Sequence, residues 1–274
     1  MSAIVGGAYK ACRADPPGLV LCFEMGASGS AATRAPARHS RDVTTLAEAR
    51  RQFVRKRSPW LIAAVIVALA VARAFAGEVG WRDGVAALAM LAIYPLGEWA
   101  IHVYLLHMRP FEFRGRRVDP PAATGHRAHH RKPNDLTIIL LEPKDIAQLL
   151  FIAMPVSIAI WAVPLSLITG SVPAAAILTA ALTTTVLIGI YEWTHFLIHT
   201  AHRPRSRYYR SIWRAHRLHH FKNEHYWHGI TNTLGDRALG TFPDHREVER
   251  SETARTLDPE GATPERSFRP VGRG

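Results

Sequence analysis

Hydrophobic residues in this chain gather into four long runs, separated by polar and basic stretches. The runs cover residues 60–76, 84–107, 146–168 and 172–190, and the last continues into Tyr191, Glu192, Trp193 and His195. A helix needs about 20 apolar residues to cross a bilayer, and a run of 17 barely suffices. The pattern therefore predicts an all-α integral membrane protein with four transmembrane helices.

Individual residues refine this prediction. Arg73 comes late in the first run, so we expect its side chain to extend outward toward the lipid headgroups. Pro155 and Pro164 should kink the third run. Only residues 169–171 separate the third run from the fourth, which predicts a tight helical hairpin.

The charges of the connecting segments predict the orientation. Arginine and lysine are abundant before the first run, after the second and after the fourth, whereas the segment between the first two runs carries only Glu78, Arg82 and Asp83. Cytoplasmic loops carry the excess of basic residues in membrane proteins. We therefore expect both termini in the cytoplasm.

The remaining segments have different compositions. Residues 1–55 are expected to be a disordered basic leader, residues 56–243 the membrane-embedded domain, and residues 244–274 a flexible tail to which we assign no function. Met25 is an alternative start of translation. Cys12 and Cys22 show no metal-binding spacing and no sign of a disulfide framework.

The net charge of +12 at first suggests a nucleic-acid-binding protein. The basic residues flank the apolar runs, however, where anionic lipid headgroups attract them. We therefore expect no nucleic acid among the partners.

Ten of the fifteen histidines fall into four spaced groups. By the predicted topology, all four groups lie on the cytoplasmic side, near the membrane surface. The groups are His102 and His107; His126, His129 and His130; His195 and His199; and His216, His219 and His220.

This spacing favours a metal site over a solvated polar face. Positions i, i+3 and i+4 share one face of a helix, so each group with that spacing should point its rings together. His102 and His107 differ by five, so one of them should lie where the helix ends. Neutral imidazole binds iron, zinc, copper or nickel, and ten rings are enough for two metals but too many for one.

The histidine order resembles that of the fatty acid hydroxylase / sterol desaturase superfamily of membrane di-iron proteins. The segment from Trp227 to Asn232, followed by Asp236, Arg237 and residues 239–241, is also similar to the end of that family's domain. The resemblance covers roughly residues 85–243. His228 and Asn232 stand where many members of the family carry an aromatic residue and serine. The resemblance therefore does not indicate the substrate.

The resemblance implies that the ten histidines bind two iron ions, although zinc accepts the same ligands. It also implies a cytoplasmic helical cap above the four spans. The expected function is O2-dependent hydroxylation of the alkyl chain of a membrane lipid, a fatty acid or fatty-acyl lipid. Desaturation, sterol or carotenoid oxidation and ether-lipid cleavage share the same metal pattern and stay open, as does the oligomeric state.

Four further residues are candidates for roles beside the histidines. Glu98 and Glu192 precede His102 and His195 by about one turn, so their carboxylates are expected to accept hydrogen bonds from the free ring N–H groups of the ligands. Their alternative role is that of helix-boundary carboxylates bonded elsewhere. His228 and Asn232 are candidates for lining the site.

The chain contains neither a heme-binding His-Pro-Gly-Gly segment nor a glycine-rich dinucleotide motif. Electrons are therefore expected from a separate redox partner, a ferredoxin or a cytochrome with its reductase. A metal transporter is the alternative from another class. It would need ionisable groups along a path through the spans, and the middles of the runs contain none.

Overall fold

The computed structural model describes residues 10–15, 19–24 and 39–257. The chain divides into two units, Met1–Pro36 and Ala37–Gly274. In the first unit, β1 (Lys10–Asp15) and β2 (Leu19–Glu24) pair in an antiparallel hairpin, within the segment expected to be a disordered leader. Met25 lies outside the described residues, so the alternative start stays a prediction.

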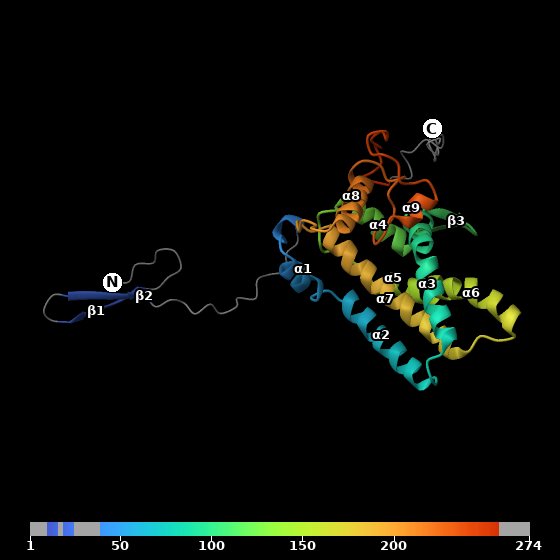
Figure 1. The fold of residues 1–274 in the computed structure, drawn as a ribbon. Coiled ribbons are helices and arrows are strands. Elements are labelled where there is room, and N and C mark those ends of the chain that lie inside the picture. The colour runs from blue at the N-terminus through green and yellow to red at the C-terminus, as the bar shows by residue number, and fades with distance from the viewer. Residues whose placement is uncertain (1–9, 16–18, 25–38, 258–274) are drawn as a thin grey trace. The chain divides into compact units, whose positions relative to one another are not determined.

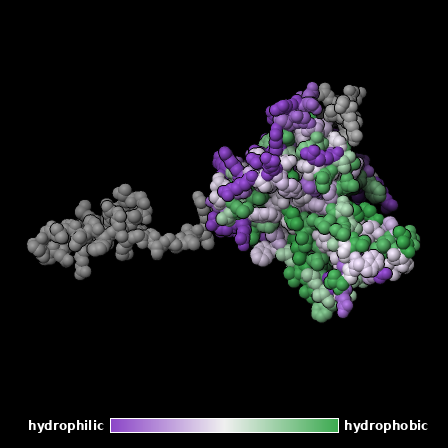
Figure 2. All heavy atoms as spheres, viewed as in Figure 1, coloured by the Kyte–Doolittle hydropathy of each residue, from purple (hydrophilic) through white to green (hydrophobic). Residues whose placement is uncertain are grey.

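The second unit is built around four long apolar helical segments (Figure 1), which confirms the four predicted spans. Hydrophobic residues cover the surface around these segments, and hydrophilic residues cover the opposite end of the unit (Figure 2). The segments are α2 (Ser58–Phe75); α3 (Trp81–Ala100) with the π-helix η2 (Ile101–Leu106); α5 (Pro143–Gln148), the π-helix η3 (Leu149–Ala153) and α6 (Met154–Thr169); and α7 (Ala174–Ile198).

Helix α7 lies at the centre of this bundle and packs against α2, α3 and α6. Ala176 and Ala180 of α7 are buried against Ala86 and Met90 of α3 and Trp161 of α6. Small side chains let the backbones of membrane helices approach closely, so that dispersion contacts hold the bundle together. In the third segment, the π-helix η3 ends just before Pro155, where proline would break regular α-helical hydrogen bonding.

The expectation for Arg73 was wrong. Its side chain is buried, and its Nε donates to Asp83 Oδ1 at 2.8 Å and to Thr179 Oγ1 at 2.9 Å. A buried guanidinium needs a charged partner, and Asp83 at the start of α3 supplies one. The pair therefore joins the ends of α2, α3 and α7 instead of reaching toward lipid headgroups.

The other end of the bundle carries a cap, comprising residues 107–142 and 199–257 (Figure 1). Its position beyond the ends of α3 and α7 agrees with the predicted helical cap. Its elements are the hairpin β3 (Phe111–Phe113) and β4 (Arg116–Val118), and the helices α4 (Pro121–Arg131), α8 (Arg207–Phe221) and α9 (Leu234–Ala238).

The predicted leader extends too far along the chain. A 3-10 helix (Ser40–Asp42) and α1 (Leu46–Phe53) precede the first span, and a capping box of Thr45 and Glu48 begins α1. Val43 and Ala49 are fully buried in a cluster with Phe196 of α7. Residues 39–55 are therefore part of the folded unit, because their apolar side chains pack on the fourth span.

The predicted flexible tail begins too early. Residues 244–257 are part of the folded cap, in which the side chains of Val248 and Ala254 are buried. Val248 packs with Ala215 and Trp227. The prediction failed because the segment is mostly polar and only two apolar residues, Val248 and Ala254, hold it in place.

The predicted orientation can be tested by cysteine labelling. In a Cys12→Ser/Cys22→Ser background, Arg205→Cys should react with a membrane-impermeant maleimide only in vesicles whose cytoplasmic face is outward. Val79→Cys, which is exposed at the opposite end of the bundle, is the matched control and should react only in vesicles of the other orientation. The reverse pattern would place the cap outside the cytoplasm.

Candidate metal centre

The ten motif histidines come together in the cap as two groups of five. Within each group, one potential donor atom per residue lies within 4.8 Å of all the others. Nine of the ten side chains are buried, and His107 is partly buried. The first cluster comprises His102, His107, His126, His130 and His219. The second cluster comprises His129, His195, His199, His216 and His220.

Helical spacing explains how two helices serve both clusters. On α4, His126 and His130 are four residues apart and enter the first cluster, whereas His129 enters the second. On α8 the division is reversed, with His216 and His220 in the second cluster and His219 in the first. Each motif presents one helix face, as expected, but its three rings divide between the two clusters.

The five-residue spacing of His102 and His107 has a different cause. The end of the second span is the π-helix η2, in which the His107 N–H donates to the carbonyl of His102 at 3.1 Å. This i to i+5 hydrogen bond replaces the usual i to i+4 pattern and brings both rings into the first cluster. Sequence spacing alone predicted only a helix end at this point.

Backbone carbonyls orient four of the rings through Nδ1. The His102 Nδ1 contacts the His228 carbonyl at 2.6 Å, and the other three contacts are 2.8 Å long. A carbonyl only accepts, so each of these Nδ1 atoms carries the proton and the Nε2 lone pair is free. The other three pairs are His130 with Ala254, His219 with Tyr226, and His199 with Pro133.

The free lone pairs point at one another. In the first cluster, His102 Nε2 and His130 Nε2 each lie 3.1 Å from His126 Nε2. Only one of these two contacts can be a hydrogen bond, because His126 Nε2 carries at most one proton. In the second cluster, His199 Nε2 lies 3.1 Å from His129 Nε2 and 2.9 Å from His216 Nε2.

A cation would resolve this crowding. Nitrogen ligands about 2.1 Å from one metal lie roughly 3 Å apart when they make a right angle at it, which matches the observed spacings. Six further nitrogens of the ten rings are buried without a partner among the described residues, and each such group costs about 1–3 kcal/mol. They are His107 Nε2, His129 Nδ1, His195 Nε2, His216 Nδ1, His219 Nε2 and His220 Nδ1. The three Nδ1 atoms belong to rings whose Nε2 already lies in the second cluster, so a cation bound through Nε2 leaves them unpaired.

Burial also keeps the rings in the form that binds metals. Desolvation lowers the pKa of His130 to about 4 and that of His199 to about 3, and it holds the pKa of His129 well below the usual value. These imidazoles are therefore neutral at pH 7, so no proton competes with a metal for the lone pair.

The roles expected for Glu98 and Glu192 are corrected by the structure. Glu98 accepts from the backbone N–H groups of Ile230 at 3.0 Å and Thr231 at 2.7 Å. Its Oε2 also accepts from Asn232 Nδ2 at 2.7 Å. Glu98 therefore holds a loop of the cap. It does not accept from His102, whose Nδ1–H already donates to the His228 carbonyl.

Glu192 is likewise bonded away from the histidine rings. It accepts from Ser58 Oγ at 2.6 Å and from the Leu141 N–H at 3.1 Å. These bonds tie α7 to the start of α2 and to the segment before α5. Glu192 therefore joins structural elements, as in the alternative reading of a helix-boundary carboxylate bonded elsewhere.

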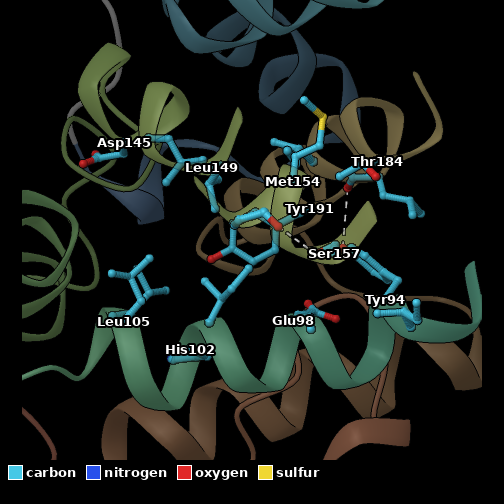
Figure 3. A pocket seen from close by; sticks show the side chains of 18 of the residues that line it. Tyr94, Glu98, His102, Leu105, Asp145, Leu149, Met154, Ser157, Thr184 and Tyr191 are labelled. Atoms are coloured by element: carbon cyan, nitrogen blue, oxygen red, sulfur yellow. Dashed lines mark hydrogen bonds between the residues drawn. The ribbon is translucent and has the colours of Figure 1, made fainter. Parts of the chain in front are cut away.

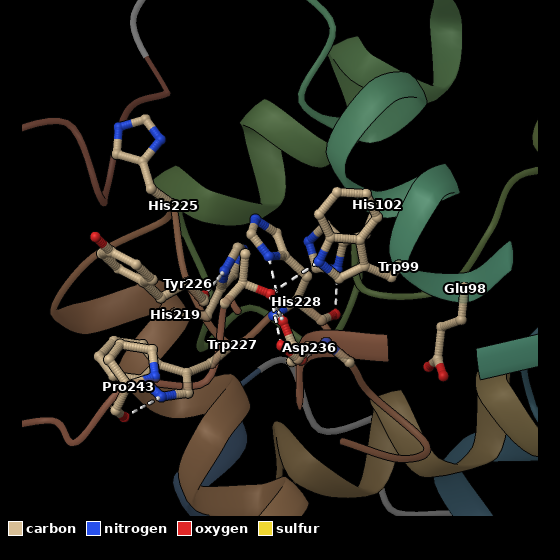
Figure 4. Close-up of polar contacts among 12 residues, drawn as sticks. Glu98, Trp99, His102, His219, His225, Tyr226, Trp227, His228, Asp236 and Pro243 are labelled. Carbon is tan, nitrogen blue, oxygen red and sulfur yellow. Dashed lines mark hydrogen bonds and ion pairs between the residues drawn. The ribbon is translucent and has the colours of Figure 1, made fainter. Parts of the chain in front are cut away.

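His228 lies beside the first cluster (Figure 4), with its ring centroid 5.5 Å from that of His102 and 5.3 Å from that of His219. Its Nδ1 is 3.4 Å from Asp236 Oδ1. The structure thus places His228 next to the site, whereas Asn232 contacts Glu98.

Asp236 shapes the site, a role that was not predicted from the sequence. Its carboxylate accepts from the N–H groups of His228 at 2.9 Å and Gly229 at 2.7 Å (Figure 4). A Cβ at Gly229 would collide with the Asn232 carbonyl, so only glycine fits this turn. Asp236 thereby fixes the loop whose His228 carbonyl orients His102.

An apolar cavity extends from the cap into the bundle, between α3, α7 and the third span. Tyr94 and Glu98 of α3 and His102 and Leu105 of η2 follow one another along the second span at the cavity wall, facing Leu149 and Met154 of the third span (Figure 3). His102 belongs to both the cavity wall and the first cluster. The cavity therefore connects the interior of the bundle with the histidine clusters.

The chain belongs to the fatty acid hydroxylase family, whose model matches residues 87–241. It is 27% identical over 150 residues to a dihydroceramide fatty acyl 2-hydroxylase of Arabidopsis thaliana, a match that covers 55% of this chain and 57% of the plant protein. The chain thus spans a little over half the length of that relative.

A solved structure shows a similar fold. The hydroxylase domain of scs7p superposes with a TM-score of 0.50 at 19% identity, covering 71% of this chain and 68% of the other. The match of the family model to residues 87–241 confirms the family resemblance of the histidine motifs.

The lowered pKa values predict acid sensitivity. Between pH 7 and pH 5 the unfolded chain takes up protons at histidines with the ordinary pKa near 6.5, whereas the folded His130 with a pKa of about 4 does not. Stability is therefore full above pH 6.5 and is lost as the pH falls toward 4. We expect the melting temperature in detergent to drop by about 5 °C or more over this interval.

His225→Gln provides the matched control, because His225 is exposed and outside both clusters. This variant should show the same loss as the wild type. A melting temperature that stays constant from pH 7 to pH 5 would contradict the burial of neutral histidines.

Proposed function

We propose that this protein is a non-heme di-iron monooxygenase that uses O2 to hydroxylate the alkyl chain of a membrane lipid. The observation that carries the proposal is the apolar cavity, which begins among membrane-spanning helices and ends at His102 of the first cluster. Membership of the fatty acid hydroxylase family and the likeness to a fatty acyl 2-hydroxylase support the same reaction.

The residues present suit two metal ions. Each cluster offers five neutral imidazoles, and the convergence of free lone pairs supplies the electron density that a divalent metal needs. A pair of iron ions held there would supply the capacity to activate O2 toward an unactivated C–H bond. Zinc bound to the same rings would lack this redox chemistry.

The cavity also suggests where the lipid is oxidised. Its wall on α3 and η2 runs from Met90 to Leu106, which corresponds to about 24 Å of helix. An alkyl tail in the deep part of this cavity would leave its polar end near the cap, where His102 lies. The oxidised carbon would then lie toward the polar end of the acyl chain, as in a 2-hydroxylase.

Protein side chains would exclude water and hold the chain. The cavity wall is mostly apolar, with Leu105, Leu149 and Met154 among its members. Burial of an acyl chain there removes apolar surface from contact with water. Glu98 and Asp236 hold the cap loop over the first cluster without contacting its metal-facing nitrogens.

Insertion of one oxygen atom from O2 requires two electrons and two protons, with the second oxygen released as water. The electrons would come from a separate redox partner, a ferredoxin or a cytochrome with its reductase. Arg205, Arg207 and Arg210 are exposed at the start of α8 and would steer an acidic donor to the cap. Reversing these charges should remove the salt dependence of electron uptake, and an unchanged dependence would exclude this docking surface.

The direct test is lipid analysis after expression under 18O2. The proposal predicts a hydroxylated acyl lipid that carries one 18O atom, is absent from the His129→Ala variant and is hydroxylated near the polar end of the acyl chain. A product with a new double bond and no 18O would indicate desaturation instead. Unchanged lipids in a metal-loaded, electron-supplied enzyme would contradict the proposal.

The cavity itself can be tested with a pair of glycines on α3. Gly97 lines the cavity, and a Cβ there meets no atom within 4 Å, so Gly97→Leu should fill the cavity without moving the backbone. We expect product formation to fall at least about tenfold while the metal content is unchanged, because the lipid and the leucine compete for the same space.

Gly84→Leu is the matched control. Gly84 is also on α3 and also has open space around a Cβ, but it does not line the cavity. This variant should retain full turnover. Equal activity of the two variants would show that the lipid uses another path.

A further inference from the structure

We propose that the two metal sites are held by different parts of the chain, and that residues 251–255 form a latch on which only the first site depends. Loss of this latch would release the metal of the first cluster and leave that of the second. The inference rests on the proposed metal binding and adds a role for a segment beyond the matched residues 87–241.

The latch contacts a ring of the first cluster directly. The Ala254 carbonyl contacts His130 Nδ1 at 2.8 Å and thereby selects the tautomer whose Nε2 faces the cluster. Arg255 donates through Nε to the His130 carbonyl at 3.3 Å and through Nη2 to the Arg131 carbonyl at 3.1 Å. The end of α4 is thus held through both the side chain and the backbone of His130.

The latch is itself anchored on the segment after α8. The Ser251 N–H donates to the Lys222 carbonyl at 2.8 Å, and the hydroxyls of Ser251 and Thr253 both donate to Glu224 Oε1. Glu224 is only 3% exposed, so these hydroxyls provide hydrogen bonds for one oxygen of a buried carboxylate, while its Oε2 has no partner among the described residues. The Arg255 guanidinium also lies over the ring of Phe221, 5.3 Å from its centroid.

The two clusters differ in where their supports come from. In the first cluster, three rings are oriented by carbonyls of the C-terminal part of the cap, at Tyr226, His228 and Ala254. In the second cluster, the carbonyl that orients a ring within the described residues belongs to Pro133, directly after α4. Its other supports are the helices α4, α7 and α8 themselves.

Backbone strain in the C-terminal part of the cap also indicates that the supports of the first cluster depend on surrounding contacts. Trp227 adopts φ of +59°, a left-handed conformation that is costly for a large side chain. The two carbonyls on either side of it, of Tyr226 and His228, are those that contact His219 and His102. The surrounding contacts, including Val248 against Trp227, must therefore hold this loop in place.

Removing the latch should weaken the first site selectively. His130 would lose the acceptor for its Nδ1 proton, and its ring would be free to turn away from the cluster. Loss of an outer partner of a metal-bound histidine typically lowers metal affinity about 10–100-fold. The second cluster has no hydrogen bond with the latch among the described contacts, so its affinity should not change.

The test compares two truncations of the full chain. One ends after Glu249 and removes the latch, and the matched control ends after Leu257 and keeps it. Metal per chain is measured by elemental analysis during titration of the iron-loaded proteins with a chelator. The control should behave as the wild type with two equivalents, whereas the latch truncation should release one equivalent at about 10–100-fold lower chelator concentration.

A double variant, Thr253→Ala/Arg255→Ala, guards against general misfolding of the truncated chain. It removes one anchor and the backbone contacts to α4, and it should shift the same single equivalent in the same direction. Retention of both metals with unchanged chelator dependence, or simultaneous loss of both in the double variant, would overturn the inference. Absence of metal from the wild type would instead overturn the proposed function.

Discussion

The structure depends on ten imidazoles packed together in the cap, nine of them buried, whose burial keeps them neutral. Burial keeps His130 and His199 unprotonated, so their lone pairs need electron-deficient partners. In these two rings and in those of His102 and His219, a backbone carbonyl takes the Nδ1 proton and leaves the Nε2 lone pair free to face a cluster. A cap that brings these rings together is stable only if each nitrogen finds a partner, and metal ions are the partners that this geometry suits.

This requirement explains the arrangement of the rest of the cap. Glu98 and Asp236 do not touch the ligand rings but hold the loop that carries the His228 carbonyl. Carboxylates can accept several backbone N–H groups at once, so one side chain fixes several residues of a loop that has no regular structure. The helices supply the rings, and the loops between and after them supply the acceptors that set the direction of each ring.

Much of this could be predicted from sequence, and the failures have physical reasons. The four spans and the ten histidines follow from hydropathy and spacing, because both depend on side-chain identity. The carbonyls of Tyr226, His228 and Ala254 leave no such signal, because every residue has a carbonyl. The π-helix at His102, the pairing of Arg73 with Asp83 and the packing of Val248 were likewise set by tertiary contacts.

The most direct test of the central claim is the iron and zinc content of the full chain, purified anaerobically in detergent after expression with iron. The account predicts about two metal ions per chain, one for each cluster of five histidines, with iron in the active preparation. His129→Ala, which removes a ring from the second cluster, should lower this number. A folded protein without stoichiometric metal would contradict the account.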